Sequence, residues 1–340
     1  MSHRKSIDHL KAFAIILVVF YHAMFQVEAS YSSLANTCVT IALRDIHVPL
    51  FILIAGYLCH RQDVRGFFRK KARRILIPFL FFTILKLVMN NLMGTEYVHG
   101  DTFPKQLWEA FVCGQLYWFC YCLLIMFLIA PLLWDRKVLQ WILLGAALTA
   151  NILLAWFEVE LTDVLQLGNV LYYSPFFLLG MLLSGYRFPG FRRSSGTEEE
   201  SAGRKSRGIW ICSAIALAGS LGTGYLRFIA DSGDRICIVD YVFGICVMYL
   251  LYLLTFLTVR AGISDRIFAA LGRYSLQIML LDPFWRILAY EIFRHVLPDG
   301  MLLAAVITPL VLALSWVTCL IFQRIPGLSF LSGLESRKVN

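Results

Sequence analysis

Lys11 and His22 lie at the two ends of an apolar run, AFAIILVVFY. On a helix they would be about 16 Å apart, half of a hydrocarbon core of about 30 Å, and eleven steps of about 100° place both on one face. An imidazole at that depth can exchange a proton, and a charged group there is unfavourable unless it faces a cavity or a partner. The spacing therefore indicates either a proton-transfer site with a cation at its mouth or a neutral histidine that hydrogen-bonds between helices.

A second cluster of ionisable groups lies in the apolar segment 39–59. Arg44, Asp45 and His47 fall within four positions of one another. One interpretation is a structural ion pair that orders the helices. Three ionisable groups at about the depth of the first imidazole favour the other interpretation, which is a polar cavity that they line together.

A run of five cations, Arg69, Lys70, Lys71, Arg73 and Arg74, directly precedes the third apolar segment. Juxtamembrane cations usually fix topology and bind anionic lipid head groups. The functional alternative is a clamp for a phosphorylated ligand, because guanidinium groups bind phosphate in a bidentate manner.

Weaker candidates lie in later segments. Trp118 begins an apolar run, so it belongs either to an interfacial aromatic belt or to a platform on which a sugar stacks. Asp282 and Arg286 are four residues apart in another run, and they form either an internal helix pair or part of a site. Lys86 also lies in an apolar run, and the sequence assigns it no partner.

The composition is that of an integral membrane protein. Of 340 residues, 59% are hydrophobic and 16% are charged, against about 25% charged in soluble domains. The net charge of +9 comes mostly from Lys and Arg residues that lie on one side of the predicted membrane spans, so we expect no nucleic-acid partner. None of the nine cysteines forms a Cys-x-x-Cys pair, and we expect neither a metal site nor a disulfide framework.

Helical spans separated by short loops account for nearly the whole chain. Of the 31 Lys and Arg residues, 24 fall on the side of both termini and five on the opposite side. The positive-inside rule then predicts an all-α bundle of about ten transmembrane helices with both termini in the cytoplasm. We expect one membrane domain over 1–340, with a flexible cytoplasmic linker at about 190–207 that is rich in Ser, Gly and charge. The ten predicted spans are 11–28, 38–58, 75–93, 113–134, 138–156, 169–186, 208–229, 236–259, 270–293 and 300–322.

Several of these segments resemble motifs of the acyltransferase type 3 family of integral membrane O-acyltransferases, in particular its short sugar O-acetyltransferases similar to fucose 4-O-acetylase. The similar segments are 7–22 (IDHLKAFAIILVVFYH), 47–56 (HVPLFILIAG), 73–78 (RRILIP), 118–119 (WF) and 271–281 (LGRYSLQIMLL). The resemblance implies a ten-helix bundle that takes an acyl group, usually acetyl from cytoplasmic acetyl-CoA, and transfers it to a hydroxyl of a cell-envelope glycan or its precursor.

The reaction that the resemblance implies also suits the residues themselves. Transfer from a thioester to a hydroxyl requires a base near the hydroxyl and positive charge near the carbonyl oxygen. Our hypothesis makes His22 the base, which the resemblance also implies, while Arg44 and His47 orient the acceptor or stabilise the oxyanion. Asp45 and Trp118 are expected to contact the acceptor. Direct transfer and an acyl-histidine intermediate are both open.

The acyl donor is expected to bind through its phosphates. The resemblance places the basic partner of the histidine at Lys11 and the family's Arg-x-x-Arg element at Lys71 and Arg74, so that a lysine stands at its first position. We expect Lys11, Lys71, Arg73 and Arg74 to hold acetyl-CoA at the cytoplasmic face.

Other classes of function are consistent with the same buried charges. A transporter or flippase for an envelope glycan or lipid-linked sugar would use them as a substrate pathway, and a scaffold or sensor would use them structurally. For the acyltransferase we expect a glycan or lipid-linked sugar acceptor, membrane lipids as partners, and residence in the plasma membrane, namely a bacterial inner membrane.

Overall fold

The structure is a computed structural model that describes nine stretches of the chain. They are residues 3–28, 34–93, 102–162, 164–184, 214–215, 218–219, 222, 237–260 and 265–335. Every regular element within them is a helix. The predicted linker at 190–207 lies outside them, as does most of the predicted span 208–229.

The chain divides into two compact units. The first comprises Met1–Phe51 and Gly185–Leu314, and the second comprises Ile52–Ser184 and Ser315–Asn340. Two helices run from the first unit into the second: α2 (Leu34–Tyr57) and α13 (Met301–Arg324). The remaining helices of the first unit are α1 (His3–Gln26), α10 (Cys237–Arg260), α11 (Asp265–Arg273) and α12 (Ser275–Phe293). The second unit holds α3 (Val64–Lys71), the π-helical turn η1 (Ala72–Leu76), α4 (Ile77–Met93), α5 (Phe103–Phe111), α6 (Trp118–Leu133), α7 (Lys137–Trp156), the short η2 (Val164–Gln166), α8 (Leu167–Leu183) and α14 (Pro326–Leu331).

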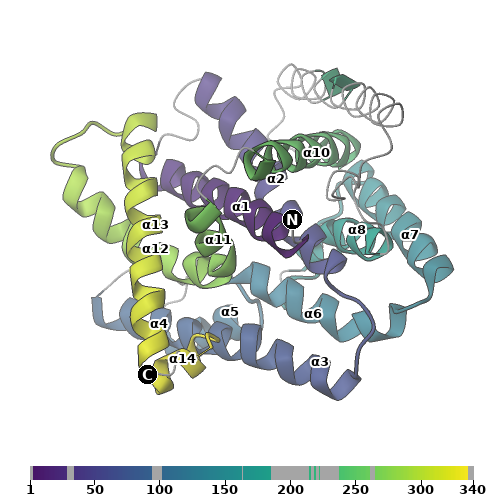
Figure 1. The fold of residues 1–340 in the computed structure, drawn as a ribbon, viewed down its shortest axis with the longest axis horizontal. Coiled ribbons are helices and arrows are strands. Elements are labelled where there is room, and N and C mark those ends of the chain that lie inside the picture. The colour runs from purple at the N-terminus through teal and green to yellow at the C-terminus, as the bar shows by residue number, and fades with distance from the viewer. Residues whose placement is uncertain are drawn as a thin grey trace. The chain divides into compact units, whose positions relative to one another are not determined.

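In the first unit, α1 packs against α10, α11 and α12 (Figure 1). Its small and branched side chains, among them Ala12, Ile15 and Val19, are fully buried. The closest approach is at Gly272 of α11, where any Cβ would collide with the carbonyl oxygen of Asp8. A glycine is therefore required for α11, and for α12 directly after it, to lie against α1.

In the second unit, α3 has one apolar and one basic face. Asp63 caps its first turn by accepting a hydrogen bond from the backbone N–H of Gly66. Phe67 is buried, with its ring centroid 5.1 Å from that of Trp134 and 5.9 Å from that of Phe127. Because the Phe67 side chain packs in the interior, the opposite, basic face of α3 points outward.

The described helices agree with the predicted spans outside 208–229. The span predicted at 75–93 is part of a longer helical run over 64–93, and the one at 270–293 is interrupted between α11 and α12. The span predicted from residue 113 begins only at Trp118, because Gly114 has a positive φ of 65°. Five of the described helices are long and apolar enough to cross a membrane: Ser6–Gln26, Val64–Leu92, Lys137–Trp156, Val164–Leu183 and Met301–Arg324. The total of ten and the orientation of the termini stay predictions.

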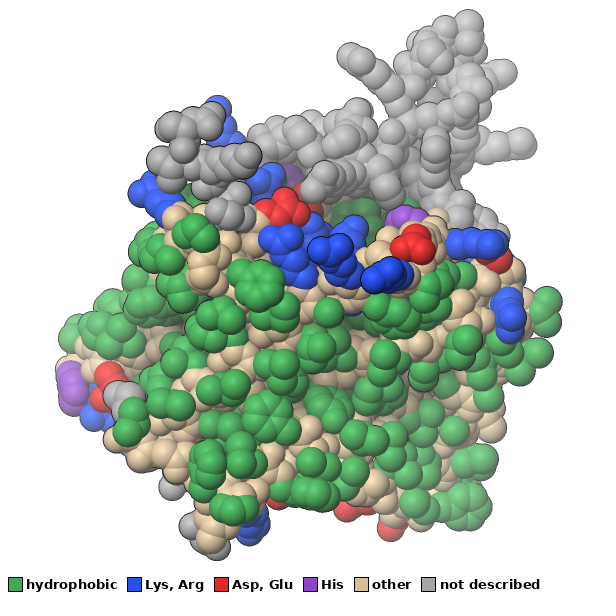
Figure 2. All heavy atoms as spheres, turned by 90° about the horizontal axis from the view of Figure 1, so that it is seen from below, with side chains coloured by type: hydrophobic (Ala, Val, Ile, Leu, Met, Phe, Trp, Pro, Cys, Tyr) green, Lys and Arg blue, Asp and Glu red, His purple; other side chains and the backbone are tan. Residues whose placement is uncertain are grey.

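The surface suits a lipid environment. In Figure 2, hydrophobic side chains cover most of the face in view, while Lys and Arg side chains gather toward its margins. Large apolar side chains such as Leu132, Val138 and Trp141 are mostly exposed. Exposed apolar area of this extent is typical of helices that face hydrocarbon.

Candidate active site

The centre of the site is a hydrogen bond between His22 of α1 and Asp282 of α12. Nδ1 of His22 lies 2.8 Å from Oδ2 of Asp282. The carboxylate is fully buried, whereas 36% of the imidazole surface is exposed. An ionised carboxylate only accepts hydrogen bonds, so this contact favours the tautomer that carries the hydrogen on Nδ1 and leaves the lone pair on Nε2. The structure thus gives His22 the orientation of a general base with a carboxylate behind it.

Arg286 and Gln26 extend this contact by one helical turn. Nε of Arg286 lies 3.4 Å from Oδ2 of Asp282, and Nη1 donates to Oε1 of Gln26 at 2.6 Å. The sequence left open whether Asp282 and Arg286 form an internal helix pair or part of a site. The structure shows the i,i+4 pair and also brings Asp282 into contact with His22.

The cluster on α2 lies beside the same histidine. The ring of His47 is 4.6 Å from the ring of Tyr21, which precedes His22, and Nδ1 of His47 contacts the carbonyl oxygen of Leu43. Asp45 is buried and accepts from Nε of Arg44 at 3.3 Å. The contact between the rings of His47 and Tyr21 places the polar cluster of α2 next to α1.

Arg44 retains a donor that no described residue uses. Its Nη2 atom is buried and has no hydrogen-bond partner within the described part of the chain. A buried guanidinium donor of this kind can receive an oxygen that gains negative charge during a reaction. The position is therefore compatible with the predicted role in orienting the acceptor or stabilising an oxyanion.

Lys11 lies on α1, eleven residues before His22, and its side chain is partly buried. Both residues belong to one continuous helix, so the predicted shared face is retained. Its predicted contact with a phosphorylated donor stays a prediction.

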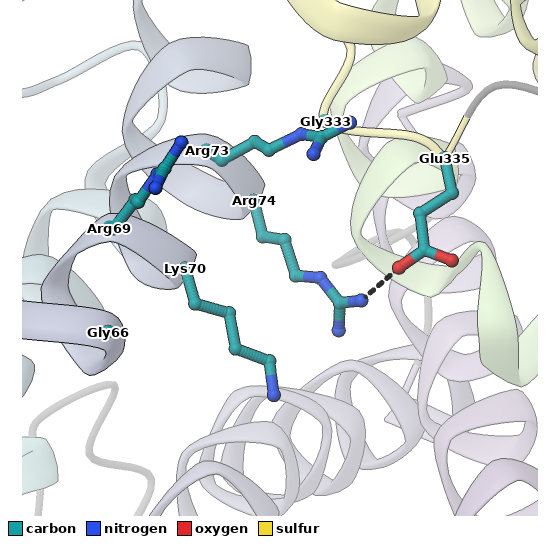
Figure 3. A pocket seen from close by; sticks show the side chains of 7 residues that line it. All are labelled: Gly66, Arg69, Lys70, Arg73, Arg74, Gly333 and Glu335. Carbon is teal, nitrogen blue, oxygen red and sulfur yellow. Dashed lines mark hydrogen bonds and ion pairs between the residues drawn. The ribbon is translucent and has the colours of Figure 1, made fainter. Parts of the chain in front are cut away.

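A separate basic pocket lies within the second unit, between the end of α3, η1 and the segment after α14 (Figure 3). It encloses about 350 Å³ and is lined by Gly66, Arg69, Lys70, Arg73, Arg74, Gly333 and Glu335. Nη2 of Arg74 is 2.5 Å from Oε1 of Glu335, and Figure 3 shows these two side chains pointing toward each other. Four cations around one cavity are suited to bind a polyanion.

Gly333 brings the acidic end of this pocket into place. Its φ of +69° is a left-handed conformation, and a Cβ there would lie 2.6 Å from Cγ of Pro78 at the start of α4. The turn after α14 therefore lies directly against the backbone of η1. As a result the carboxylate of Glu335 reaches the guanidinium of Arg74.

The structure does not bring Lys71 into the basic pocket. Lys71 is four residues after the buried Phe67 and therefore shares its helix face. Its ammonium group lies 3.4 Å from the ring centroid of Phe127 and 5.3 Å from that of Phe67. Arg73 and Arg74, which we expected to hold the donor with Lys71, line the pocket together with Arg69 and Lys70.

Trp118 begins α6 in the second unit and stacks on Tyr173 of α8, with ring centroids 5.4 Å apart. Lys86, which the sequence did not place, is buried with its ammonium group 4.1 Å from the ring centroid of Tyr117. Tyr173 covers one face of the Trp118 indole, which the sequence suggested as a platform for a sugar. The side chain of Trp118 is otherwise partly exposed.

Comparison with known proteins identifies the family. The family model of the acyltransferase domain, acyltransferase type 3, matches residues 4–320. The chain belongs to this acyltransferase family. Over 185 residues it is 31% identical to nodulation protein NolL of Sinorhizobium fredii (strain NBRC 101917 / NGR234), a match that covers 52% of the chain and 48% of NolL. The chain thus matches about half of that relative's length, and no solved structure matches it.

For this membrane acyltransferase, the sequence interpretation missed the partner of the histidine. The sequence suggested Arg286 as a partner of Asp282 but did not suggest His22, which is 260 residues away along the chain. The sequence signal for Asp282 was the unfavourable free energy of an ionisable group in an apolar span, and the same signal marks His22.

Proposed function

We propose that this protein moves an acyl group, with acetyl as the expected one, from cytoplasmic acyl-CoA to a hydroxyl of a cell-envelope glycan or lipid-linked sugar precursor. The observation that carries the proposal is the hydrogen bond from His22 to the buried Asp282. Membership of the acyltransferase family over residues 4–320 supports the reaction class. The bacterial inner membrane is the proposed location.

The reaction follows from the orientation of the imidazole. Nε2 of His22 takes the proton of the acceptor hydroxyl as its oxygen attacks the thioester carbonyl carbon. The imidazolium that forms is stabilised through Nδ1–H by Asp282. The unused Nη2 donor of Arg44 would receive the negative oxygen of the tetrahedral intermediate. When the C–S bond breaks, the thiolate of CoA leaves and recovers the proton from Nε2.

The donor would bind through its phosphates at the basic pocket. Arg69, Lys70, Arg73 and Arg74 supply four positive charges around a cavity of about 350 Å³. Arginine can contact phosphate oxygens in a bidentate manner, which favours a phosphorylated donor over an uncharged one. Lys11 is the remaining candidate for a donor contact and lies on the helix that carries His22.

The acceptor side of the site is proposed to include Asp45, His47 and Trp118. His47 adjoins Tyr21 next to the catalytic histidine, and Asp45 holds Arg44. A partly exposed indole stacked on a tyrosine provides a flat apolar surface of the kind that binds sugar rings.

Two measurements test the donor and the product. Acetyl-CoA should raise the melting temperature of the purified protein in detergent, and an equal concentration of acetate should not. Mass spectrometry of envelope glycans should show O-acetyl groups in cells that express the wild-type protein and none in cells that express His22→Ala at the same level. Absence of protection by acetyl-CoA together with normal glycans would favour a glycan transporter instead.

The proposed orientation has both termini in the cytoplasm, which would give the donor access to the basic pocket. The support is the excess of Lys and Arg on that side of the predicted spans. Cysteines introduced one at a time at Ser195 and Thr162 test it with a membrane-impermeant thiol reagent on intact cells, in a background without the native cysteines. The cysteine at 162 should react and the one at 195 should not, and the reverse pattern would overturn the orientation.

A further inference from the structure

Asp282 depends on very few contacts to hold its position. Its side chain is fully buried, and its Oδ2 atom is contacted by His22 and by Arg286. Its Oδ1 atom has no hydrogen-bond partner among the described residues. A buried carboxylate is strongly disfavoured in its ionised form unless a cation accompanies it. Arg286 is permanently charged and its Nε atom lies 3.4 Å from Oδ2 of Asp282, so it supplies a positive charge beside the buried carboxylate.

Arg286 is itself held by the helix that carries His22. Its Nη1 atom donates to Oε1 of Gln26 at 2.6 Å, and only 16% of its side chain is exposed. His22 and Gln26 are four residues apart on α1, as Asp282 and Arg286 are on α12. Each cross-helix pair spans 260 positions of sequence. The two helices therefore run parallel here. Two cross-helix contacts one helical turn apart, His22 with Asp282 and Gln26 with Arg286, join them, and we call each contact a rung.

We propose that Arg286 is a positioning residue of the acyl-transfer reaction and that Gln26 fixes it. Arg286 places a positive charge beside Asp282 and keeps its carboxylate aimed at Nδ1 of His22, and the contact with Gln26 fixes the position of Asp282 along α1. This inference rests on the proposed function, because it requires His22 to act as the base. It assigns to Arg286 an effect on the rate of transfer and none on the affinity for the donor.

The test is a double-mutant cycle between Arg286 and Asp282. Membrane vesicles of cells that make each variant, with equal amounts of the protein, are given radiolabelled acetyl-CoA, and transfer to envelope glycans is followed at several donor concentrations. We expect Arg286→Gln to lower the maximal rate by about 10- to 100-fold, with the KM for acetyl-CoA unchanged. In an Asp282→Asn background, the same change should cause less than about 3-fold further loss, because Arg286 acts through the carboxylate.

Two further variants separate positioning from a general role in folding. Gln26→Leu removes only the second rung and should lower the maximal rate by about 3- to 10-fold, while Gln26→Glu retains an acceptor and should be at least as active as the wild type. Arg294→Gln is the matched control, because Arg294 forms an i,i+3 pair with Glu291 at the exposed end of α12. We expect this control to transfer acetyl groups at the wild-type rate.

The outcomes distinguish this inference from the function on which it rests. A fully active Arg286→Gln variant, or an equally large loss in the Asp282→Asn background, would overturn the positioning role and leave the acyltransferase intact. A fully active Asp282→Asn variant would instead remove the carboxylate from the proposed mechanism. If the Arg286→Gln variant does not accumulate, the two Gln26 variants decide, and equal rates for Leu and Glu would refute the rung.

Discussion

The two polar regions of this acyltransferase hold their charges in opposite ways. Asp282 is fully buried and is contacted by residues on two helices, whereas Glu335 in the basic pocket is 77% exposed and forms an ion pair with Arg74. Inside a protein, charges interact strongly and a misplaced group is costly, while exposed charges are screened by water and salt. We therefore expect the pair His22 and Asp282, here called the dyad, to act through its geometry and the basic pocket to act through the sum of its charges.

The largest effect should come from the dyad. His22→Ala removes the proposed base and should lower acetyl transfer by about 10²- to 10⁴-fold. The imidazole is partly exposed, so the change should leave the fold and the basic pocket in place. The measurement is transfer in membrane vesicles, and protection by acetyl-CoA in a thermal shift confirms that the variant is folded. Near-normal transfer by a folded His22→Ala protein would refute the mechanism.

The basic pocket should respond in affinity and not in the rate of the chemical step. Arg73→Gln combined with Arg74→Gln should weaken acetyl-CoA binding by about 10- to 100-fold, because two charged contacts are lost. The difference from the wild type should shrink at high salt, where screening already weakens the attraction. Thermal shift in detergent measures it on correctly inserted protein.

Arg61→Gln is the matched control for this double change. Arg61 is 77% exposed and pairs with Asp135 within the same unit, and neither residue lines the pocket. If the control weakens acetyl-CoA binding as much as the double variant does, the effect is one of overall charge. If neither change alters the affinity, the pocket cations serve topology or lipid binding instead.

Lys71 provides a sharper comparison within the same basic run. Its ammonium group lies over the ring of Phe127, so Lys71→Met should change the affinity for acetyl-CoA by less than about 2-fold. Single variants Lys71→Met and Arg73→Gln, compared at low salt by thermal shift, separate the two helix faces. An equal loss of affinity in both would return Lys71 to the phosphate clamp that the sequence predicted.

A small effect in the opposite direction, towards tighter binding, should come from the acidic wall of the pocket. Glu335 occupies one face of Arg74 and repels an incoming phosphate, so Glu335→Gln should strengthen acetyl-CoA binding by about 2- to 3-fold at low salt. Titration of the melting temperature with acetyl-CoA measures this shift. Weaker binding by this variant would show that the carboxylate contributes to the donor site.

The sequence predicted the helices better than it predicted which polar side chains contact one another. Apolar runs and the cost of intramembrane charge identified α1, α2 and His22, because these signals are local. The contact between His22 and Asp282 depends on how α1 and α12 pack, which no local signal carries. The face occupied by Lys71 was predictable from its i,i+4 relation to Phe67, whereas the approach of Glu335 to Arg74 depends on a turn far along the chain.

The close approach of Gly272 to Asp8 has a consequence for genetics. Gly272 lies ten residues before Asp282, about 15 Å along the α11 and α12 run, and takes no part in the chemistry. A side chain at that position would displace α11 from α1 and with it the carboxylate behind His22. In a selection for cells that no longer acetylate their glycans, alleles of Gly272 should therefore be recovered beside alleles of His22, as lesions of the same phenotype that arise from backbone packing.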